Sequence, residues 1–412
     1  MSDKLTSTLI DFFKQNAIPA GSTIGVGVSG GADSLCLARR LALLAPKLGF
    51  SIRTATVNHG LRPEAETEAE LTKTYMTRLG IPHDTLYWKG PKPTARLEER
   101  AREKRYDLLT DWCHSHQIRH LFLAHQAEDE AETFWTRLTH GSGIDGLGAI
   151  APVRAHRDIL ICRPFLKINR AQLETDLKQA GWTWATDNMN HDPTYERVRW
   201  RHRQSTLSEM GLTPACIGRA TERLRRAREA LDFYTGIAIR QTTQFQPEGF
   251  AIVHLPIFQE LPIDMQIRVI TTILNQIGTK QPRLEQIEAW LNTFPVRTTL
   301  GGCHLIRRHK TLFVAREASR MPASQLIPAD TPTYWDRFRI TTPMPATITA
   351  NAPKSIVSDL PFLVRQSVPV LQSDPPLIPL FRIITQKELE KDPILDYKKR
   401  DKNIALIELI MN

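Results

Sequence analysis

The sequence lacks any closely spaced pair of cysteines. Its five cysteines, spread over 412 residues, form no CxxC pair: they are Cys36, Cys113, Cys162, Cys216 and Cys303. An odd number of widely separated cysteines argues against a zinc ribbon, an iron–sulfur site and a disulfide framework. We therefore expect reduced thiols, as in a cytosolic protein.

Long hydrophobic runs are also missing. No stretch approaches the ~18 uncharged apolar residues of a membrane-spanning helix. Charged side chains at Asp3, Lys4, Asp11 and Lys14 interrupt the N-terminus, which is not the pattern of a signal peptide. The remaining composition, 41% hydrophobic and 24% charged, is that of a globular protein. The expectation is a soluble, cytoplasmic protein with no membrane partner.

Acidic residues are fewer than basic ones. There are 44 Asp and Glu against 54 Lys and Arg, which gives a formal net charge of +10. An excess of this size suggests a polyanionic partner such as nucleic acid, although many basic proteins bind none. At roughly 150 residues per domain, the length predicts two to three domains. No pattern in the chain predicts an oligomeric state.

The first 205 residues alternate between strand-like and helix-like segments. Strands are expected at 23–29, 51–58, 83–88, 121–125 and 159–164. Helices are expected at 35–48, 64–79, 95–116 and 127–138. This alternation predicts an α/β domain over residues 1–205, with a parallel sheet covered by helices on both faces.

The rest of the chain divides into two further regions. Residues 206–297 read as a helical domain, with helices at 216–239, 262–277 and 282–294. Residues 298–412 begin with a hairpin at 298–315 and continue into a proline-rich, weakly defined β region, with short strands at 338–340, 346–348 and 381–384. The segment 397–412 gives no interpretable pattern.

A glycine-rich loop follows the first expected strand and precedes the first helix. Its residues are Ser29, Gly30, Gly31, Ala32, Asp33 and Ser34. Ligands bind at the carboxyl ends of strands in open parallel sheets, and the glycines let backbone N–H groups approach a phosphate. An aspartate would repel a phosphate unless a cation lay between them, so Asp33 is a candidate Mg²⁺ ligand.

Three interpretations of this loop compete. It could be a capped turn, although two glycines, two serines and an aspartate exceed the needs of a cap. It could be a dinucleotide fingerprint, but Gly25 and Gly27 lie inside the strand, and no acidic ribose ligand follows the second strand. The third interpretation is a pyrophosphate-binding SGGxDS loop. A Walker A loop is excluded because GxxxxGK[ST] does not occur.

The loop resembles that of the N-type ATP pyrophosphatases, which cleave ATP between the α- and β-phosphates. Further motifs, in order, are similar to those of one family among them, tRNA(Ile)-lysidine synthetase. They are Val57-Asn58-His59-Gly60-Leu61-Arg62, Glu98 with Ala101 to Tyr106, Ala124 to Thr133, Gly141-Ser142-Gly143 with Gly146-Leu147, Arg163-Pro164-Phe165 with Arg170, and Trp184 to Arg201 with Asp187, Asn190, Asp192 and Arg197. The resemblance is close over roughly residues 20–205.

The resemblance implies a ligase that uses ATP and Mg²⁺ to attach L-lysine to the wobble cytidine of a CAU-anticodon tRNA(Ile). It implies an adenylylated cytidine intermediate and a change from methionine to isoleucine specificity. Residues Ser29 to Ser34 would hold ATP. Asp33 and Asp129 would be the metal ligands, and Asp129, Arg102 and His125 the catalytic candidates. The alternatives are another ATP-pyrophosphatase tRNA enzyme, such as a thiolase, and a non-catalytic tRNA-binding paralogue.

The residue types also admit plainer roles. Acidic residues after His125 complement a helix dipole, and arginines at 102 and 105 could be a solvated face. The chain departs from the family pattern at Glu128 and Glu130 in the same segment, which leaves the metal geometry open. In the arginine-rich helix, spacing places Arg219, Arg223 and Arg226 on one face and Arg225 and Arg228 elsewhere. We expect that first face to contact tRNA.

Overall fold

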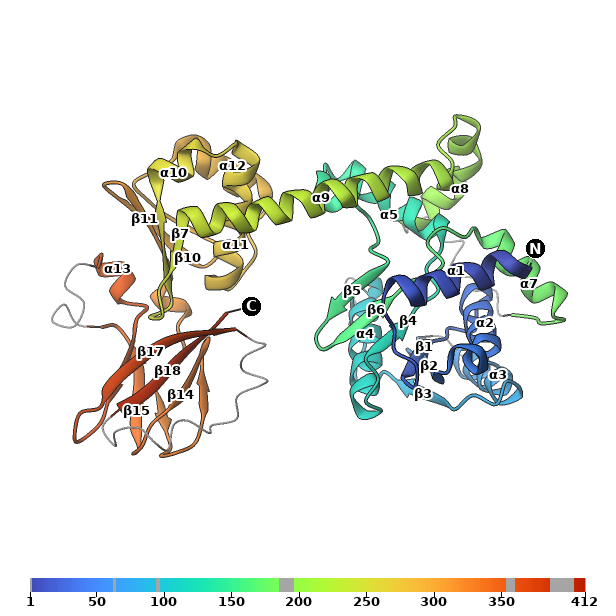
Figure 1. Ribbon diagram of the computed structural model, residues 1–412, viewed down its shortest axis with the longest axis horizontal. Coiled ribbons are helices and arrows are strands. Elements are labelled where there is room, and N and C mark those ends of the chain that lie inside the picture. The colour runs from blue at the N-terminus through green and yellow to red at the C-terminus, as the bar shows by residue number, and fades with distance from the viewer. Residues whose placement is uncertain are drawn as a thin grey trace. The chain divides into compact units, whose positions relative to one another are not determined.

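The computed structural model consists of two compact units, Met1–Glu229 and Ala230–Asn412 (Figure 1). The boundary falls within one long helix, α9 (Pro214–Thr242). The described residues are 2–61, 64–93, 97–184, 196–352, 360–385 and 404–411. Across these ranges, none of the helices has the length and apolar character needed to cross a membrane. The predicted boundaries at 205 and 297 stay predictions.

The first unit is built on a six-stranded sheet with the strand order β3-β2-β1-β4-β6-β5. The strands are β1 (Thr23–Gly27), β2 (Ser51–Asn58), β3 (His83–Tyr87), β4 (His120–Phe122), β5 (Val153–His156) and β6 (Ile159–Cys162). All neighbours pair in parallel except β5, which pairs antiparallel with β6. The predicted parallel sheet is confirmed, with five strands close to their expected bounds. The edge strand β5 was not predicted.

Helices connect these strands, as the alternation predicts. They are α1 (Ser2–Gln15), α2 (Ala32–Leu48), α3 (Ala65–Arg78), α4 (Leu97–Ser115), α5 (Ala127–Thr139), α6 (Ile144–Leu147), α7 (Arg170–Gln179) and α8 (Glu196–Glu209). The four predicted helices correspond to α2, α3, α4 and α5. Helices α1, α6, α7 and α8 were not predicted from the sequence.

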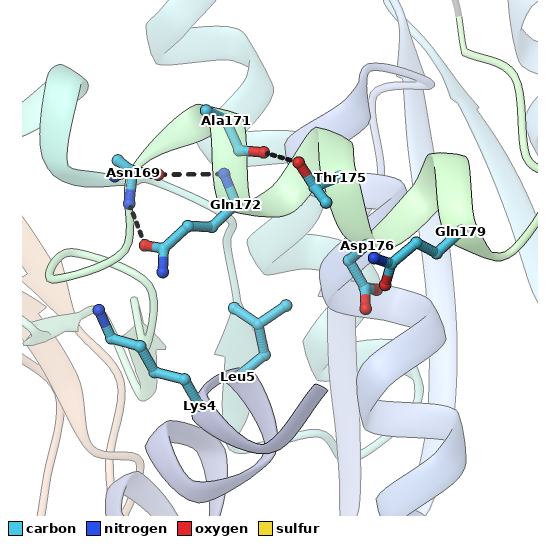
Figure 2. A pocket seen from close by; sticks show the side chains of 8 residues that line it. All are labelled: Lys4, Leu5, Asn169, Ala171, Gln172, Thr175, Asp176 and Gln179. Carbon is cyan, nitrogen blue, oxygen red and sulfur yellow. Dashed lines mark hydrogen bonds between the residues drawn. The ribbon is translucent and has the colours of Figure 1, made fainter. Parts of the chain in front are cut away.

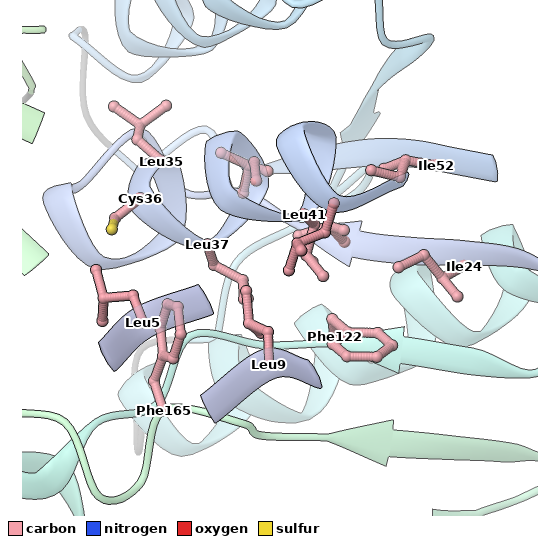
Figure 3. Packing of buried hydrophobic residues seen from close by; sticks show 14 of the residues in the cluster. Leu5, Leu9, Ile24, Leu35, Cys36, Leu37, Leu41, Ile52, Phe122 and Phe165 are labelled. Carbon is pink, nitrogen blue, oxygen red and sulfur yellow. The ribbon is translucent and has the colours of Figure 1, made fainter. Parts of the chain in front are cut away.

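Side chains of the central strands alternate between two hydrophobic layers. On one side, Phe122 packs with residues of α1 and α2, among them Leu9 and Leu37 (Figure 3). On the other side, Leu121 packs with Trp112 of α4. This alternation is the period-two pattern of a strand buried on both faces. The two layers fix the sheet between its helices, and therefore fix where the strand ends lie.

A buried ion pair joins α2 to α7 on one face of the sheet. The Asp176 carboxylate, 6% exposed, accepts hydrogen bonds from Arg40 Nε at 3.1 Å and Arg39 Nη1 at 3.0 Å. Arg40 also pairs with it through Nη2. Each of these charges would be costly to bury alone, so together they hold the two helices in one alignment.

The second unit contains a five-stranded sheet with the order β7-β8-β11-β10-β9. These strands are β7 (Thr243–Phe245), β8 (Phe250–His254), β9 (Arg297–Leu300), β10 (Cys303–Arg308) and β11 (Thr311–Arg316). Helices α10 (Leu255–Glu260), α11 (Ile263–Ile277) and α12 (Leu284–Thr293) belong to the same unit. The predicted helices and hairpin are confirmed. Strands β7 and β8, inside the region expected to be helical, were not predicted.

The C-terminal region forms two small sheets, seen at the orange and red end of Figure 1. One contains β12 (Gln325–Ile327), β15 (Ala346–Ala350) and β16 (Pro369–Gln372), and the other contains β13 (Thr333–Trp335), β14 (Phe338–Thr341), β18 (Ile404–Met411) and β17 (Ile378–Thr385). The predicted β-rich character is confirmed. The last strand, β18, lies in the segment that gave no sequence pattern, and it pairs in parallel with β17.

Candidate active site

The loop between β1 and α2 is held by its own serines. Ser29 N–H donates to Ser34 Oγ at 3.0 Å, and Ser34 Oγ donates to the Gly31 carbonyl at 3.0 Å. The two hydroxyls lie 3.2 Å apart. These contacts turn the chain so that α2 begins at Ala32, at the carboxyl end of a central parallel strand. The loop therefore lies where the sequence predicted a ligand site.

Gly30 is required by the shape of this turn. Its φ of +84° lies in the left-handed region, and a Cβ atom there would be 2.9 Å from Thr72 Oγ1. The Thr72 hydroxyl is itself fixed by donating to the Glu68 carbonyl at 2.8 Å. A larger residue would be both strained and crowded, so the close approach of α3 to the loop depends on this glycine.

Asp33 is the carboxylate of the loop, and its pKa is raised. Its side chain is 18% exposed, and its Oδ2 lies 3.4 Å from Arg170 Nη2. Its Oδ1 is buried and has no hydrogen-bond partner among the residues that the structure describes. Burial raises the pKa of Asp33 to about 6; the Arg170 charge opposes the rise, and the Asp129 and Glu128 charges add to it. An unpartnered carboxylate oxygen beside other carboxylates is a fitting ligand for a divalent cation.

The first turn of α5 brings two more carboxylates to the same place. Gln126 caps the helix by accepting the Glu128 N–H at 2.6 Å, and Asp129 Oδ2 accepts the Gln126 N–H at 3.1 Å. Glu128 Oε2 accepts the Arg170 N–H at 3.1 Å. Asp129 thus serves as a capping residue, a role that the sequence did not predict beside the helix-dipole interpretation. Its Oδ1 lies 3.7 Å from Arg201 Nη2, longer than a hydrogen bond.

His125 is oriented by a buried arginine. Arg163 Nε donates to His125 Nδ1 at 3.3 Å, and Arg163 Nη1 donates to the Ala151 carbonyl at 2.9 Å. Because a guanidinium can only donate, Nδ1 must accept, and the neutral imidazole carries its proton on Nε2. His125 therefore presents Nε2 as a hydrogen-bond donor. This orientation suits contact with an oxygen-rich substrate.

The predicted catalytic Arg102 lies on the exposed surface of α4. Its Cζ is 5.4 Å from the centre of the Tyr106 ring. Burial lowers the pKa of Arg105, which lies one turn further along the helix. The charges of Tyr106 and Asp129 oppose this change, and the charge of Arg102 adds to it. The structure thus brings Asp33, Asp129, Glu128 and Arg105 into electrostatic contact. The roles of Asp33, Asp129, His125 and Arg102 stay predictions.

Arginines from later in the chain complete the site. Arg170, at the start of α7, pairs with Asp33, and Arg201 of α8 lies between Asp129 and Glu132, with its Nε 2.5 Å from Glu132 Oε1. Both arginines belong to motifs seen in the sequence, but these pairings were not predicted from it. No local signal points to them, because each partner is more than sixty residues away.

Some predicted residues contribute elsewhere or fall outside the described ranges. Trp182 stacks on Tyr75 with ring centres 4.6 Å apart and packs against the core. Trp184 packs against the same core. The motif residues Arg62, Asp187, Asn190 and Asp192 lie outside the residues that the structure describes.

A cavity of about 230 Å³ lies between α1 and α7 (Figure 2). It is lined by Lys4, Leu5, Asn169, Ala171, Gln172, Thr175, Asp176 and Gln179. None of the predicted site residues lines it. Its single carboxylate, Asp176, is already paired with Arg39 and Arg40. The cavity is therefore separate from the loop site.

Metal binding by protein side chains alone is not built into the described part of the chain. No group of three or more His, Cys, Asp or Glu residues within those ranges is arranged to hold a metal ion. Mg²⁺ commonly takes one or two carboxylates and completes its shell with water and substrate phosphates. A site based on Asp33 fits that pattern, whereas an all-protein cage does not.

Comparisons with known proteins agree with this geometry. Residues 1–206 match the family model described as PP-loop domain. A tRNA(Ile)-lysidine synthase from Ruegeria pomeroyi is 36% identical over 298 residues, which are 71% of this chain and 71% of the relative. One from Methylobacterium sp. (strain 4-46) is 37% identical over 73% of this chain and 90% of its own. One from Wolbachia pipientis wMel is 32% identical over 77% and 76%.

The raised pKa of Asp33 predicts that this residue lowers the stability of the metal-free fold. Its pKa rises from 3.8 to about 6 on folding, so the folded state binds the proton more tightly than the unfolded chain does. The stabilising effect of that proton is complete below pH 4 and is lost as the pH rises through 6. Without Mg²⁺ or ATP, Asp33→Asn should therefore be more stable than the wild type at pH 7.5. The scale is about 1.4 kcal/mol per pKa unit.

Urea unfolding at pH 4 and pH 7.5 measures this difference. The gain should be much smaller at pH 4, where Asp33 is protonated in the folded state and partly protonated in the unfolded chain. Asp11→Asn is the control, because that side chain is exposed on α1 of the same unit, and it should show no such pH dependence. A less stable Asp33→Asn variant at pH 7.5 would contradict the prediction.

Proposed function

The chain belongs to the tRNA(Ile)-lysidine synthase family, and we propose that it ligates L-lysine to C2 of the wobble cytidine in CAU-anticodon tRNA(Ile). Relatives that carry this name match over most of the chain. The observation that carries the proposal is the Ser29–Ser34 loop at the carboxyl end of β1, with the buried and unpartnered Oδ1 of Asp33 beside it. The product would read the isoleucine codon instead of the methionine codon.

The reaction proceeds in two steps. The O2 atom of the cytidine attacks the α-phosphorus of ATP, and pyrophosphate leaves. An amine of free lysine then attacks C2, and AMP leaves with the former O2, while the amine loses a proton. The first step builds negative charge on the departing phosphates, and the second needs an acceptor for the proton.

The loop and its neighbours supply the ATP site. Backbone N–H groups at the start of α2 point towards the loop and favour a phosphate there. Asp33 would hold Mg²⁺, which neutralises charge on the phosphates when bound. Arg170, 3.4 Å from Asp33, adds a cation on the same side. Nε2–H of His125 is a donor suited to orienting a phosphate oxygen.

Asp129 is proposed as the second metal ligand or as the base for the lysine amine. Its Oδ2 is fixed by the Gln126 N–H at 3.1 Å, so the position of the carboxylate is set by the helix cap. Its Oδ1 faces Arg201, 3.7 Å from Nη2. A carboxylate held by a helix cap and an arginine is oriented before the substrate arrives.

Thiolase chemistry, the main alternative within the fold, is disfavoured by the cysteines. Cys113, Cys162 and Cys303 are buried, and burial raises the pKa of each thiol to about 12. Burial also raises the pKa of Cys36. Buried neutral thiols are poor nucleophiles and metal ligands. Sulfur transfer would need reactive cysteines, so ligation of an amine fits these residues better.

The surface of α9 in the first unit supports tRNA as the substrate. Arg219, Arg223 and Arg226 are exposed and share one face of the helix, as their spacing predicts. Arg225 instead points to Glu130, with Nη1 2.5 Å from Oε1, and Arg228 lies 3.5 Å from Asp145. The exposed face is therefore the part of this helix best suited to phosphates.

The proposed activity is tested by nucleoside analysis. Unmodified CAU-anticodon tRNA(Ile) incubated with the chain, ATP and labelled lysine should yield labelled lysidine, with AMP and pyrophosphate released only when tRNA is present. Asp33→Asn should be slower by about 10²-fold or more, the scale of a lost electrostatic contact. A chain that binds the tRNA yet releases no AMP would support the non-catalytic alternative.

A second experiment separates the chemical role of Asp129 from its capping role. The amide oxygen of Asp129→Asn can still accept the Gln126 N–H, so the helix cap should survive. We expect lysidine formation to be abolished while tRNA affinity changes less than about twofold, roughly 0.4 kcal/mol. Asp264→Asn, an exposed carboxylate with 60% exposure, is the control. Loss of tRNA binding with intact turnover would reassign Asp129 to a structural role.

A third experiment tests the arginine face of α9. Replacing Arg219, Arg223 and Arg226 with Ala should weaken tRNA binding and make its salt dependence shallower by up to about three phosphate equivalents. ATP binding should persist, because the nucleotide loop is on another element. Arg228→Ala is the matched control on the same helix, since Asp145 already faces that side chain. An unchanged salt slope in the triple variant would show that the face is only solvated.

A further inference from the structure

Two exposed arginines from different elements lie against one tyrosine ring in the first unit. The Cζ atoms of Arg102 on α4 and Arg154 on β5 are each 5.4 Å from the centre of the Tyr106 ring. The ring itself is only 9% exposed, and its hydroxyl receives a long hydrogen bond, 3.5 Å, from Arg163 Nη2. A buried aromatic ring thus fixes two solvent-exposed guanidinium groups at its surface.

These two arginines have no carboxylate partner among the residues that the structure describes. Arg157 provides the contrast, because it belongs to the same β5–β6 hairpin. Its guanidinium pairs with Asp107 at 2.7 Å and with Asp111 at 3.2 Å, both on α4. The same helix therefore neutralises Arg157 and leaves Arg154 unneutralised.

Further positive charges surround the pair. Burial lowers the pKa of Arg163, and the charges of Arg154 and Arg102 lower it further. The pKa of Arg137 is also lowered by burial first and then by Arg102, Arg228 and Arg154. Although burial alone would raise the pKa of Tyr106, the nearby charges of Arg102 and Arg163 lower it. Cations repel one another here, and an anion would relieve that repulsion.

The position of Arg137 shows how this group relates to the ATP site. Arg137 and Asp129 lie on the same helix, α5, eight residues apart. At 1.5 Å per residue this separation is about 12 Å along the helix. The Arg137 guanidinium is itself held by the carbonyls of Gly146 and Ala149, at 2.6 and 2.8 Å, so it adds positive charge without being the group that would bind. The positive group therefore continues along α5 beyond Asp129, and a chain of phosphates could follow it further than the triphosphate of one ATP.

We propose that Arg154 and Arg102, held against Tyr106, bind phosphodiester groups of the tRNA next to the reacting cytidine. This inference rests on the proposed function in one respect, that tRNA is the substrate. It gives Arg102, which the sequence made a catalytic candidate, a role in binding phosphate. It also adds Arg154, which no motif singled out. A guanidinium suits this role because its planar set of donors matches phosphate oxygens.

The test compares Arg154→Ala with Arg157→Ala in the full chain. The affinity for a CAU-anticodon tRNA transcript is measured across a salt series, and ATP and pyrophosphate binding are measured in parallel. Loss of one phosphate contact lowers the slope of log affinity against log salt concentration by about 0.7–0.9. Over a tenfold change in salt, this corresponds to a difference of roughly 5- to 8-fold in affinity. We expect that loss for Arg154→Ala, with ATP and pyrophosphate binding unchanged. Arg157→Ala should keep the wild-type slope.

Arg154→Lys keeps the charge and should keep most of the salt slope, which separates a phosphate contact from a general loss of structure. An unchanged slope in Arg154→Ala, or an equal loss in Arg157→Ala, would overturn the proposal. Weakened ATP or pyrophosphate binding with an unchanged slope would assign the arginine pair to the nucleotide and overturn it as well. A wild-type chain that binds tRNA but forms no lysidine would sink the proposed function alone.

Discussion

The alignment of α2 against α7 depends on two ion pairs. In one pair α2 supplies the acid, and in the other it supplies the base. Asp33 and Arg40 lie seven residues apart on α2, and their partners Arg170 and Asp176 lie six residues apart on α7. The matching spacings mean that the helices run side by side in one direction, with an acid facing a base at each end. Removing Asp176 would leave the buried Arg40 charge without its carboxylate, at a cost of about 3–5 kcal/mol. This buried pair therefore helps to place Arg170 where it can meet the loop, so the site inherits part of its geometry from the other end of the same helix contact.

The loop end of the same alignment works against stability. Asp33, Asp129 and Glu128 are brought close enough for their charges to raise the pKa of Asp33, on top of the effect of burial. Arg170 offsets only part of this, since the shift stays upward. A carboxylate left partly uncompensated in the free protein has more to gain from a cation or a phosphate-bound metal than one already neutralised. The buried Arg40–Asp176 pair holds the two helices together despite the uncompensated charge at Asp33. That uncompensated charge is the feature that makes Asp33 useful for binding a cation.

Local sequence patterns predicted most strands of the first sheet and the glycine-rich loop, but not the contacts between distant segments. Strand β2 has the expected bounds, because its β-branched residues and the turn after it are local signals. Strand β5 was missed because a four-residue segment with an arginine and a histidine has no strand signature, and it forms only by pairing with β6. The loop was recognisable from its glycines and serines, whereas the partner of Asp33 was not, since Arg170 is 137 residues away. Partners at such separations are set by tertiary packing, which one sequence does not display.

Glu130, one of the departures from the family pattern, joins helix α5 to helix α9. It is 2% exposed, and its Oε1 accepts hydrogen bonds from Arg225 Nη1 at 2.5 Å and Thr221 Oγ1 at 2.9 Å. Arg225 also donates to the carbonyls of Gly148 and Ile150. Glu130 directly follows Asp129, so the first turn of α5 carries Asp129 and also holds α9 through Arg225. The face of α9 that carries Arg219, Arg223 and Arg226 is oriented by the same contact, because Arg225 can reach Glu130 only with that face turned away. One buried pair thus fixes both the turn that carries Asp129 and the direction in which the exposed arginines of α9 point.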